Sequence, residues 1–245
     1  MRRRGAFSLV ELSVVLVIIG LLITAISTGT KLVEQSKVNT VISQLREYEY
    51  AYNNFYMTYN AFPGDISNAT SYFSGTQDGN GNDIIESACS GGPNGLEPYM
   101  AMQHLNLAGL IQHNYTGVGV VDGAEAERAE IGTNIAATSF GGIGMLIRYM
   151  ETITVYSGAS DSVVESNLIQ LGGPHQTCTG AHDTTLKTVY SYNIDKKIDD
   201  ALPSKGKVYS GSVFSSCVEA GATDDQYNLD DDSQLCRSFY TLSNN

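Results

Sequence analysis

The stretch DGNGNDIIE, from Asp78 to Glu86, places oxygen-bearing side chains at alternating positions between glycines. A calcium ion takes about six to eight oxygen ligands, and a loop of this composition can wrap around it. We therefore predict a calcium site with the ligands Asp78, Asn80, Asn82, Asp83 and Glu86. The match to an EF-hand loop is incomplete, because Asp83 stands at the sharp-turn glycine position and Cys89 at the position of the closing glutamate. The alternative is a solvated Asn-Gly turn that binds no ion.

Two other groups of side chains are weaker candidates for a metal site. The C-terminal stretch is a candidate for a second calcium ion, but a solvated run of charge is the simpler interpretation of Asp224, Asp225, Asp230, Asp231 and Asp232. His175, Cys178 and His182 offer three zinc ligands at loose spacing without a fourth, so we predict no zinc site. The sequence contains no nucleophile elbow, phosphate loop or HExxH motif. We therefore expect neither enzyme activity nor a required cofactor.

The charge of the chain argues against one class of protein. The 245 residues carry a net charge of −12, and the one basic cluster, Arg2–Arg4, lies at the N-terminus. Phosphate backbones require clustered Lys and Arg, so we expect no specific nucleic-acid binding. The composition, with 42% hydrophobic and 16% charged residues, is that of a globular protein.

Residues 7–28 form an apolar segment that follows the three arginines and contains one carboxylate, Glu11. As a helix this segment would measure about 33 Å, enough to cross the hydrocarbon core of a bilayer. The arginines orient it with the N-terminus in the cytoplasm and the rest of the chain exported. A cleaved signal peptide is the alternative, but Glu11 falls within the apolar run and no small-residue cleavage site follows it. We therefore predict a retained membrane anchor.

The stretch GAFSLVELSVVLVIIGLL, residues 5–22, resembles the class III leader and N-terminal helix of type IV pilins and type II secretion pseudopilins. In that family a membrane peptidase cuts before the apolar run and methylates the new N-terminus. The resemblance places the cut between Ala6 and Phe7, because Glu11 then follows the new first residue by four positions. A cut between Gly5 and Ala6 is the alternative, since glycine is more common before the cut, but it leaves Glu11 one place late.

The resemblance also gives Glu11 a role in assembly. A carboxylate in apolar surroundings is tolerated when a charged partner forms a hydrogen-bonded pair with it. In an assembled filament the α-amino group of Phe7 in one subunit can meet Glu11 of a neighbour. A subunit out of register would leave that carboxylate unpaired, so the pair can enforce register. A glutamate that reaches the membrane interface by itself is the alternative.

The fold class that we predict is α+β with a pilin-like architecture. Apolar residues at helical spacing continue past Gly29 to about Phe62, where Pro63 ends the helix. The helix is apolar all round in its first half and amphipathic in its second, and it should pack on an antiparallel sheet domain with an enlarged loop region. We divide the chain into a leader (1–6), a membrane or filament-core helix (7–30), a stem helix (31–62) and an exported head (63–245).

Within the head, the apolar spacing predicts a few elements separated by loops. We expect helices near 97–112 and 183–199. Strands are expected at 144–157, 166–172 and 207–217. The stretches 63–95 and 218–245 are expected to be loops, the first rich in glycine and asparagine and the second acidic.

The four cysteines form an even set without a CxxC motif: Cys89, Cys178, Cys217 and Cys236. Outside the cytoplasm such a set indicates two disulfides, with three possible connectivities. Many pilins close a C-terminal region with a disulfide, and this resemblance implies the pair Cys217–Cys236, which leaves Cys89–Cys178 as the second pair. Closing the loop between Cys217 and Cys236 with a disulfide contributes about 3 kcal/mol to the stability of the fold.

These observations together predict a structural subunit of a type IV pilus-like filament, a pilin or minor pilin polymerised through its N-terminal helix. The resemblance implies other pilin subunits, prepilin peptidase, an assembly platform and its ATPase as partners. It also implies a single-pass protein of the bacterial inner membrane before assembly and an extracellular or periplasmic filament afterwards. A type II secretion pseudopilin is the alternative within this class. A secreted binding module or enzyme with an ordinary signal peptide is the alternative from another class.

Overall fold

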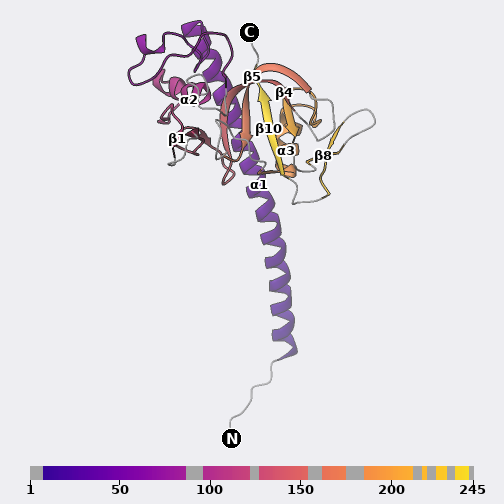
Figure 1. The fold of residues 1–245 in the computed structure, drawn as a ribbon. Helices are drawn as coiled ribbons and strands as arrows, with labels where there is room; N and C mark the ends of the chain where they lie inside the picture. Colours follow the sequence, from indigo (N-terminus) through magenta and orange to yellow (C-terminus); the bar gives the residue numbers. More distant parts are fainter. Residues whose placement is uncertain are drawn as a thin grey trace.

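The computed structural model consists of a rod that projects from a head (Figure 1). It describes residues 8–86, 96–121, 127–153, 162–174, 185–211, 217–219, 225–230 and 235–242. The rod is the first half of helix α1, Leu9–Tyr59, which is 51 residues long, about 77 Å at 1.5 Å per residue. The second half of the same helix runs through the head. The predicted pilin-like α+β architecture is therefore confirmed.

Helix α1 begins at a capped N-terminus and ends at a left-handed residue. The Ser8 side chain caps its first turn, and no proline interrupts it. At the other end Asn60 adopts φ 51° and ψ 37°, and its N–H donates to the Tyr56 carbonyl at 2.8 Å. Asparagine tolerates this conformation well, which terminates the helix at Tyr59 instead of near Phe62, where Pro63 alone would place the end.

The head is built on an antiparallel sheet in the order β3-β4-β5-β10-β6, with β7 also paired to β10. The two longest strands form one hairpin, in which Met145 lies opposite Leu171 and Ile147 opposite Ile169. The bounds of the strands are Ala136–Ala137 for β3, Gly144–Ile153 for β4, Ser162–Gly172 for β5, Leu186–Lys187 for β6, Val208–Gly211 for β7 and Leu235–Thr241 for β10. The three expected strands are thus confirmed with changed bounds: the second begins earlier, at Ser162, and the third is described over Val208–Gly211.

Short helices and hairpins surround this sheet. Helix α2 is Glu97–Leu107 and helix α3 is Thr188–Ile198, which confirms both expected helices with shorter bounds. A 3-10 turn, η1 at Ala69–Ser71, is the one regular element that the structure describes between α1 and residue 86. Two small hairpins complete the head: β1 (Val120–Val121) with β2 (Glu127–Arg128), and β8 (Val218–Glu219) with β9 (Gln226–Tyr227).

The expectation of an acidic loop over 218–245 is wrong, because β10 is a central strand of the sheet. It pairs with β5 along one edge and with β6 and β7 along the other. Arg237 and Ser238 interrupt its apolar residues, so the sequence pattern did not indicate a buried strand. The buried hydroxyl of Ser238 is instead hydrogen-bonded, donating to Ser191 Oγ at 2.9 Å and lying 2.8 Å from Ser210 Oγ. A polar residue is tolerated in the core when its hydrogen bonds are made there.

The core of the head lies between the second half of α1 and the sheet. The buried residues of α1 recur at intervals of mostly three, as one face of a helix requires: Val38, Val41, Ile42, Leu45, Tyr48, Ala51, Tyr52 and Phe55. They pack in one cluster with apolar residues of the sheet, among them Met145, Ile147, Ile169 and Leu171. Burying each large side chain contributes roughly 1.5–3 kcal/mol, so this face fixes α1 to the head.

Candidate functional site

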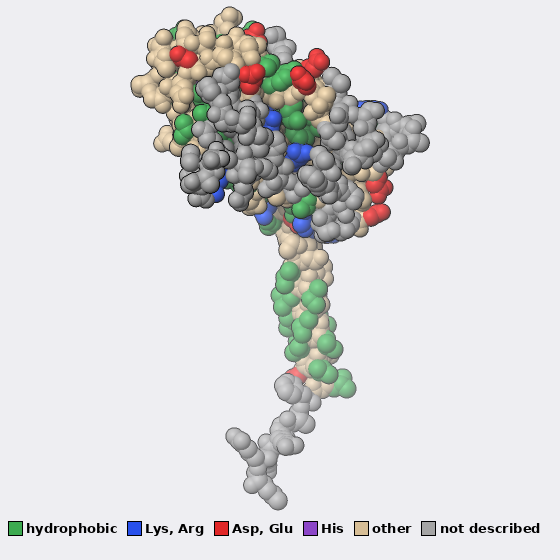
Figure 2. Space-filling model, viewed as in Figure 1, with side chains coloured by type: hydrophobic (Ala, Val, Ile, Leu, Met, Phe, Trp, Pro, Cys, Tyr) green, Lys and Arg blue, Asp and Glu red, His purple; other side chains and the backbone are tan. Residues whose placement is uncertain are grey.

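The first half of α1 has no protein packed around it. None of residues 8–37 is buried, and Leu16 and Ile23 are 62% and 63% exposed. An 18-residue window of α1 reaches a mean hydropathy of 2.8 with none of it buried, and α1 is the one helix in the described part of the chain that is long and apolar enough to cross a membrane. Apolar side chains cover the projecting rod (Figure 2). Such a surface requires lipid or other protein around it.

Glu11 lies in the first turn of this bare helix. The Ser8 N–H donates to Glu11 Oε2 at 2.8 Å, and the Val10 N–H donates to Ser8 Oγ at 3.3 Å, so Ser8 and Glu11 form a capping box. The carboxylate therefore points toward the helix N-terminus, where the helix dipole favours negative charge. Phe7 and Ala6, like Gly5, lie outside the described residues, so the position of the cut stays a prediction.

The predicted calcium ligands lie in the loop that follows α1, residues 60–86. Asp78 accepts two hydrogen bonds from Thr70, from its N–H at 2.8 Å and from its hydroxyl at 3.2 Å. Asn80 Nδ2 donates to Glu86 Oε2 at 2.7 Å. Asp83 has φ 68°, the left-handed conformation that an EF-hand loop requires at its glycine position. The backbone turn thus fits a calcium loop, while the side-chain oxygens are bonded within the protein, and calcium binding stays a prediction.

Two buried carboxylates that the sequence patterns did not single out hold this loop in place. Asp65 and Glu97 are 1% and 0% exposed. Asp65 accepts backbone N–H groups at 2.8, 3.0 and 2.9 Å from Gly81, Asn82 and Asp83. Glu97 accepts two more, at 3.2 and 2.8 Å, from Asn80 and Glu86. The sequence patterns gave neither carboxylate a role in this loop, so only the tertiary contacts reveal it.

Burial changes the titration of both carboxyl groups. It raises the pKa of Glu97 to about 7 and also raises the pKa of Asp65, while the backbone N–H bonds act in the opposite direction. The loop packs so tightly on Asp65 that a Cβ at Gly79 would lie 2.4 Å from the Asp65 carbonyl oxygen. A cation held by this loop would lower these pKa values, so cation binding and pH would be coupled here.

The N-terminal end of the chain is similar to a known protein family. Residues 1–27 match the family model described as the prokaryotic N-terminal methylation motif. The chain carries a class III prepilin leader. Neither the curated proteins nor the solved structures contain a significant match to the chain.

The prepilin motif explains why the apolar rod is left bare. The motif implies processing by prepilin peptidase, membrane anchoring before assembly and assembly into a pilin-type filament. It marks structural proteins of the pilin type, which are not enzymes. The rod, Glu11 and the motif thus form one candidate assembly site at the N-terminal end.

A disulfide joins Cys217 to Cys236, with the two Cα atoms 5.3 Å apart, as the resemblance to pilins implied. It links the β8–β9 hairpin to the start of the central strand β10. Within the acidic C-terminal stretch, the Asp230 N–H donates to Asn228 Oδ1 at 3.2 Å. Several other predicted residues lie outside the described part of the chain: Cys89, His175, Cys178, His182, Asp224, Asp231 and Asp232.

A group of three carboxylates near the end of α3 was also missed by the sequence patterns: Asp195, Asp199 and Asp200. Asp195 is buried and accepts hydrogen bonds from the Tyr227 hydroxyl at 2.8 Å and the Ala201 N–H at 3.2 Å. Burial raises its pKa to about 7. The Tyr227 bond attaches the β8–β9 hairpin to α3, so Asp195 has a structural role.

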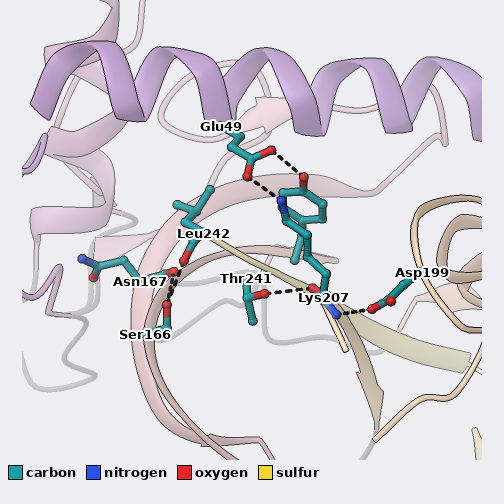
Figure 3. A network of polar contacts seen from close by, with 8 residues as sticks. Glu49, Ser166, Asn167, Asp199, Lys207, Thr241 and Leu242 are labelled. Carbon is teal, nitrogen blue, oxygen red and sulfur yellow. Dashed lines mark hydrogen bonds and ion pairs between the residues drawn. The ribbon is translucent and has the colours of Figure 1, made fainter. Parts of the chain in front are cut away.

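A polar network attaches the second half of α1 to the sheet (Figure 3). Glu49 Oε1 lies 2.6 Å from Lys207 Nζ, and the Tyr240 hydroxyl donates to Glu49 Oε2 at 2.6 Å. The Lys207 ammonium also lies over the Tyr240 ring, 4.8 Å from its centre. These contacts join α1 to β10 and to Lys207, which directly precedes β7, so they attach the second half of the helix to the head.

Proposed function

We propose that this protein is a structural subunit of a type IV pilus-like filament, cut before Phe7 and polymerised through the first half of α1. The observation that carries the proposal is the bare apolar half of α1 directly after a prepilin motif. A lipid bilayer covers this surface before assembly, and the same halves of neighbouring subunits cover it in the filament.

The geometry at Glu11 supports its role in this assembly. The capping box holds the carboxylate at the helix N-terminus, next to the position where cleavage before Phe7 creates a new amine. In the membrane, the Ser8 N–H gives the carboxylate one hydrogen bond within its own chain. In the filament, the methylated amine of a neighbouring Phe7 adds a positive charge. A charged partner compensates a buried carboxylate more fully than one neutral donor does, so subunits in register are favoured.

The proposal is tested by expressing the full chain in a bacterium with prepilin peptidase and a filament-assembly machine. Mass spectrometry of the mature protein should identify N-methylated Phe7 as the first residue. Glu11→Ala should be cut normally but yield at least about tenfold fewer filaments. The variant leaves the Phe7 amine of a neighbouring subunit without its partner, and an unpaired buried charge costs roughly 3–5 kcal/mol. Glu47→Ala, which removes an exposed carboxylate from the same helix, is the matched control and should assemble normally.

Two results would contradict the proposal. A mature N-terminus beyond residue 26 would identify an ordinary signal peptide and a secreted protein. Normal filament yield from Glu11→Ala would exclude the pairing role of Glu11, although the subunit could still be a pilin.

A further inference from the structure

Exposed lysines gather at the end of the head from which the rod projects, and acidic residues predominate at the other end of α1. From Glu47 to Glu127 the sequence contains no Lys or Arg. This run includes the loop that follows the far end of α1, with the buried Asp65 and further acids at 78, 83 and 86. On the face shown in Figure 2, acidic side chains lie at the end of the head farthest from the rod, and a further acidic group lies on one side.

The acids of the far end come from two segments that lie side by side. The Tyr149 N–H donates to the Ile85 carbonyl at 2.8 Å, and the Ile85 N–H donates to Asn167 Oδ1 at 3.0 Å. The loop therefore lies against β4 and β5, where each strand approaches the end of their hairpin. We call the following residues the far-end acids: Asp78, Asp83, Glu86, Glu151 and Glu165. All but the half-buried Glu86 are exposed.

The opposite end of the head, where the rod leaves it, carries lysines. Lys197 Nζ donates to Asn39 Oδ1 at 2.7 Å, which places the end of α3 beside the first buried turn of α1. We call four exposed residues the near-end lysines: Lys31, Lys37, Lys196 and Lys197. Glu34 also lies here and accepts from the Tyr190 hydroxyl at 3.2 Å. Asp199 and Asp200 follow α3, and each accepts a backbone N–H, from Lys207 and Leu202.

The way in which copies enter the membrane decides which ends can meet. All copies are inserted in the same orientation, so their α1 helices are parallel. When parallel copies are staggered along their common axis, the far end of one head approaches the near end of another, which is a heterologous contact. The head extends along α1 from Val38 to Tyr59, about 33 Å, so a stagger of this size brings the two ends together.

We propose that the near-end lysines of one subunit bind the far-end acids of the next copy along the filament. This inference rests on the proposed filament function and identifies the head surfaces that the contact uses. After loss of the three leader arginines the net charge changes from −12 to −15, so heads placed without regard to their charges would repel one another. Four lysines against three acids at the near end, facing five acids at the far end, make the axial contact attractive despite that net charge, and this favours one direction of stacking.

The test combines charge reversal with changes in salt concentration. Lys196→Glu with Lys197→Glu should lower the yield of sheared filaments about tenfold at low salt, since each surface pair shifts an equilibrium by up to roughly fivefold. Wild-type filaments should dissociate faster as NaCl rises, because the Debye length falls from about 30 Å at 0.01 M to about 3 Å at 1 M. The double variant should respond in the opposite sense, because salt screens its repulsion.

A second variant separates loss of contact from loss of folding. Adding Glu151→Lys and Glu165→Lys to the double variant changes the sign of two charges at each end of every subunit, so it should partly restore the filament yield that the double variant loses. Arg128→Glu with Lys205→Glu is the matched control, because it changes the net charge equally at other sites and should leave the yield unchanged.

Each result decides between defined alternatives. If no wild-type filaments form, the proposed function fails. If filaments form but the double variant matches wild type and salt has no effect, the axial contact is wrong while the filament function stands. If the double variant loses only binding to vesicles of anionic phospholipid and assembles normally, the lysines bind the membrane surface and the inference is likewise wrong.

Discussion

The two halves of α1 share one continuous backbone and have opposite surroundings. From Leu9 to Lys37 no side chain is buried, whereas from Val38 to Phe55 every third or fourth residue is in the core. The helix is apolar on all sides as far as residue 28, and from Val38 it has a single apolar face. The first half therefore depends on lipid or on other copies, and the second depends on its own head. The two halves of one helix thus lie in different environments, and mutations in the two halves should affect different measurements.

The largest effect is expected from a matched pair of leucines, one in each half. Leu45 is fully buried, so Leu45→Ala should destabilise the head by about 2–5 kcal/mol, the usual range for a core leucine. Leu22 is 56% exposed and lies in the unburied half of α1, so Leu22→Ala should leave head unfolding unchanged and act on filament yield alone. Thermal unfolding of the detergent-solubilised protein measures the first effect. Equal destabilisation by both variants would contradict the division of α1 into two environments.

The disulfide should stabilise the head and leave the rod unaffected. Cys217→Ser with Cys236→Ser should lower the free energy of unfolding by about 3 kcal/mol, because the loop closed by the bond spans a sequence separation of 19. Helical circular dichroism from the first half of α1 in micelles should not change. Loss of that signal would mean that the rod depends on the head for its helical structure.

A smaller, pH-dependent effect is expected at Asp195. Its pKa is raised to about 7 in the folded head, so the folded state holds the proton more tightly than the unfolded state. Its contribution to stability is therefore full at low pH and is lost as the pH rises from about 4 through 7. Asp195→Asn should flatten this part of the profile, and the Tyr227 hydroxyl can turn to accept from the new amide. The midpoint of thermal unfolding from pH 5 to pH 8 measures this change. An unchanged slope in the variant would assign the pH dependence to other groups.

The smallest and most local effect concerns calcium in the loop after α1. If the loop binds calcium through Asp78, Asp83 and Glu86, then EDTA should lower the thermal stability of the head and increase proteolysis within 60–86. Asp78→Asn should remove that response. Filament disassembly by EDTA in wild type and not in the variant would extend the effect to the filament. Identical unfolding and proteolysis with EDTA and with added calcium would exclude the ion.

Much of the architecture followed from local patterns. Helix α1 was predictable because its apolar residues recur at helical spacing and no proline occurs before Pro63. The helix ends at Tyr59 and not near Phe62, as predicted, because Asn60 adopts a left-handed conformation that the sequence permits but does not require. Strand β10 was missed because Arg237 and Ser238 resemble a surface segment, and only pairing on both edges makes this strand central.

The candidate sites divide in the same way. Glu11 and the leader could be predicted because their motif lies in a short contiguous stretch, which the family model also matches. The role of Asp65 and Glu97 could not be predicted, because the two residues are far apart in the sequence and both contact the loop only in the folded protein.

The sequence by itself determined the leader, the apolar half-helix and the run of 81 residues without Lys or Arg, because each of these is a property of consecutive residues. Only the tertiary structure decided where the stem helix becomes buried, which carboxylates lie inside the loop, and that the lysines of α3 join those of α1 at one end of the head. Burial and charge juxtaposition depend on contacts between distant residues, and such contacts arise only when the chain has folded.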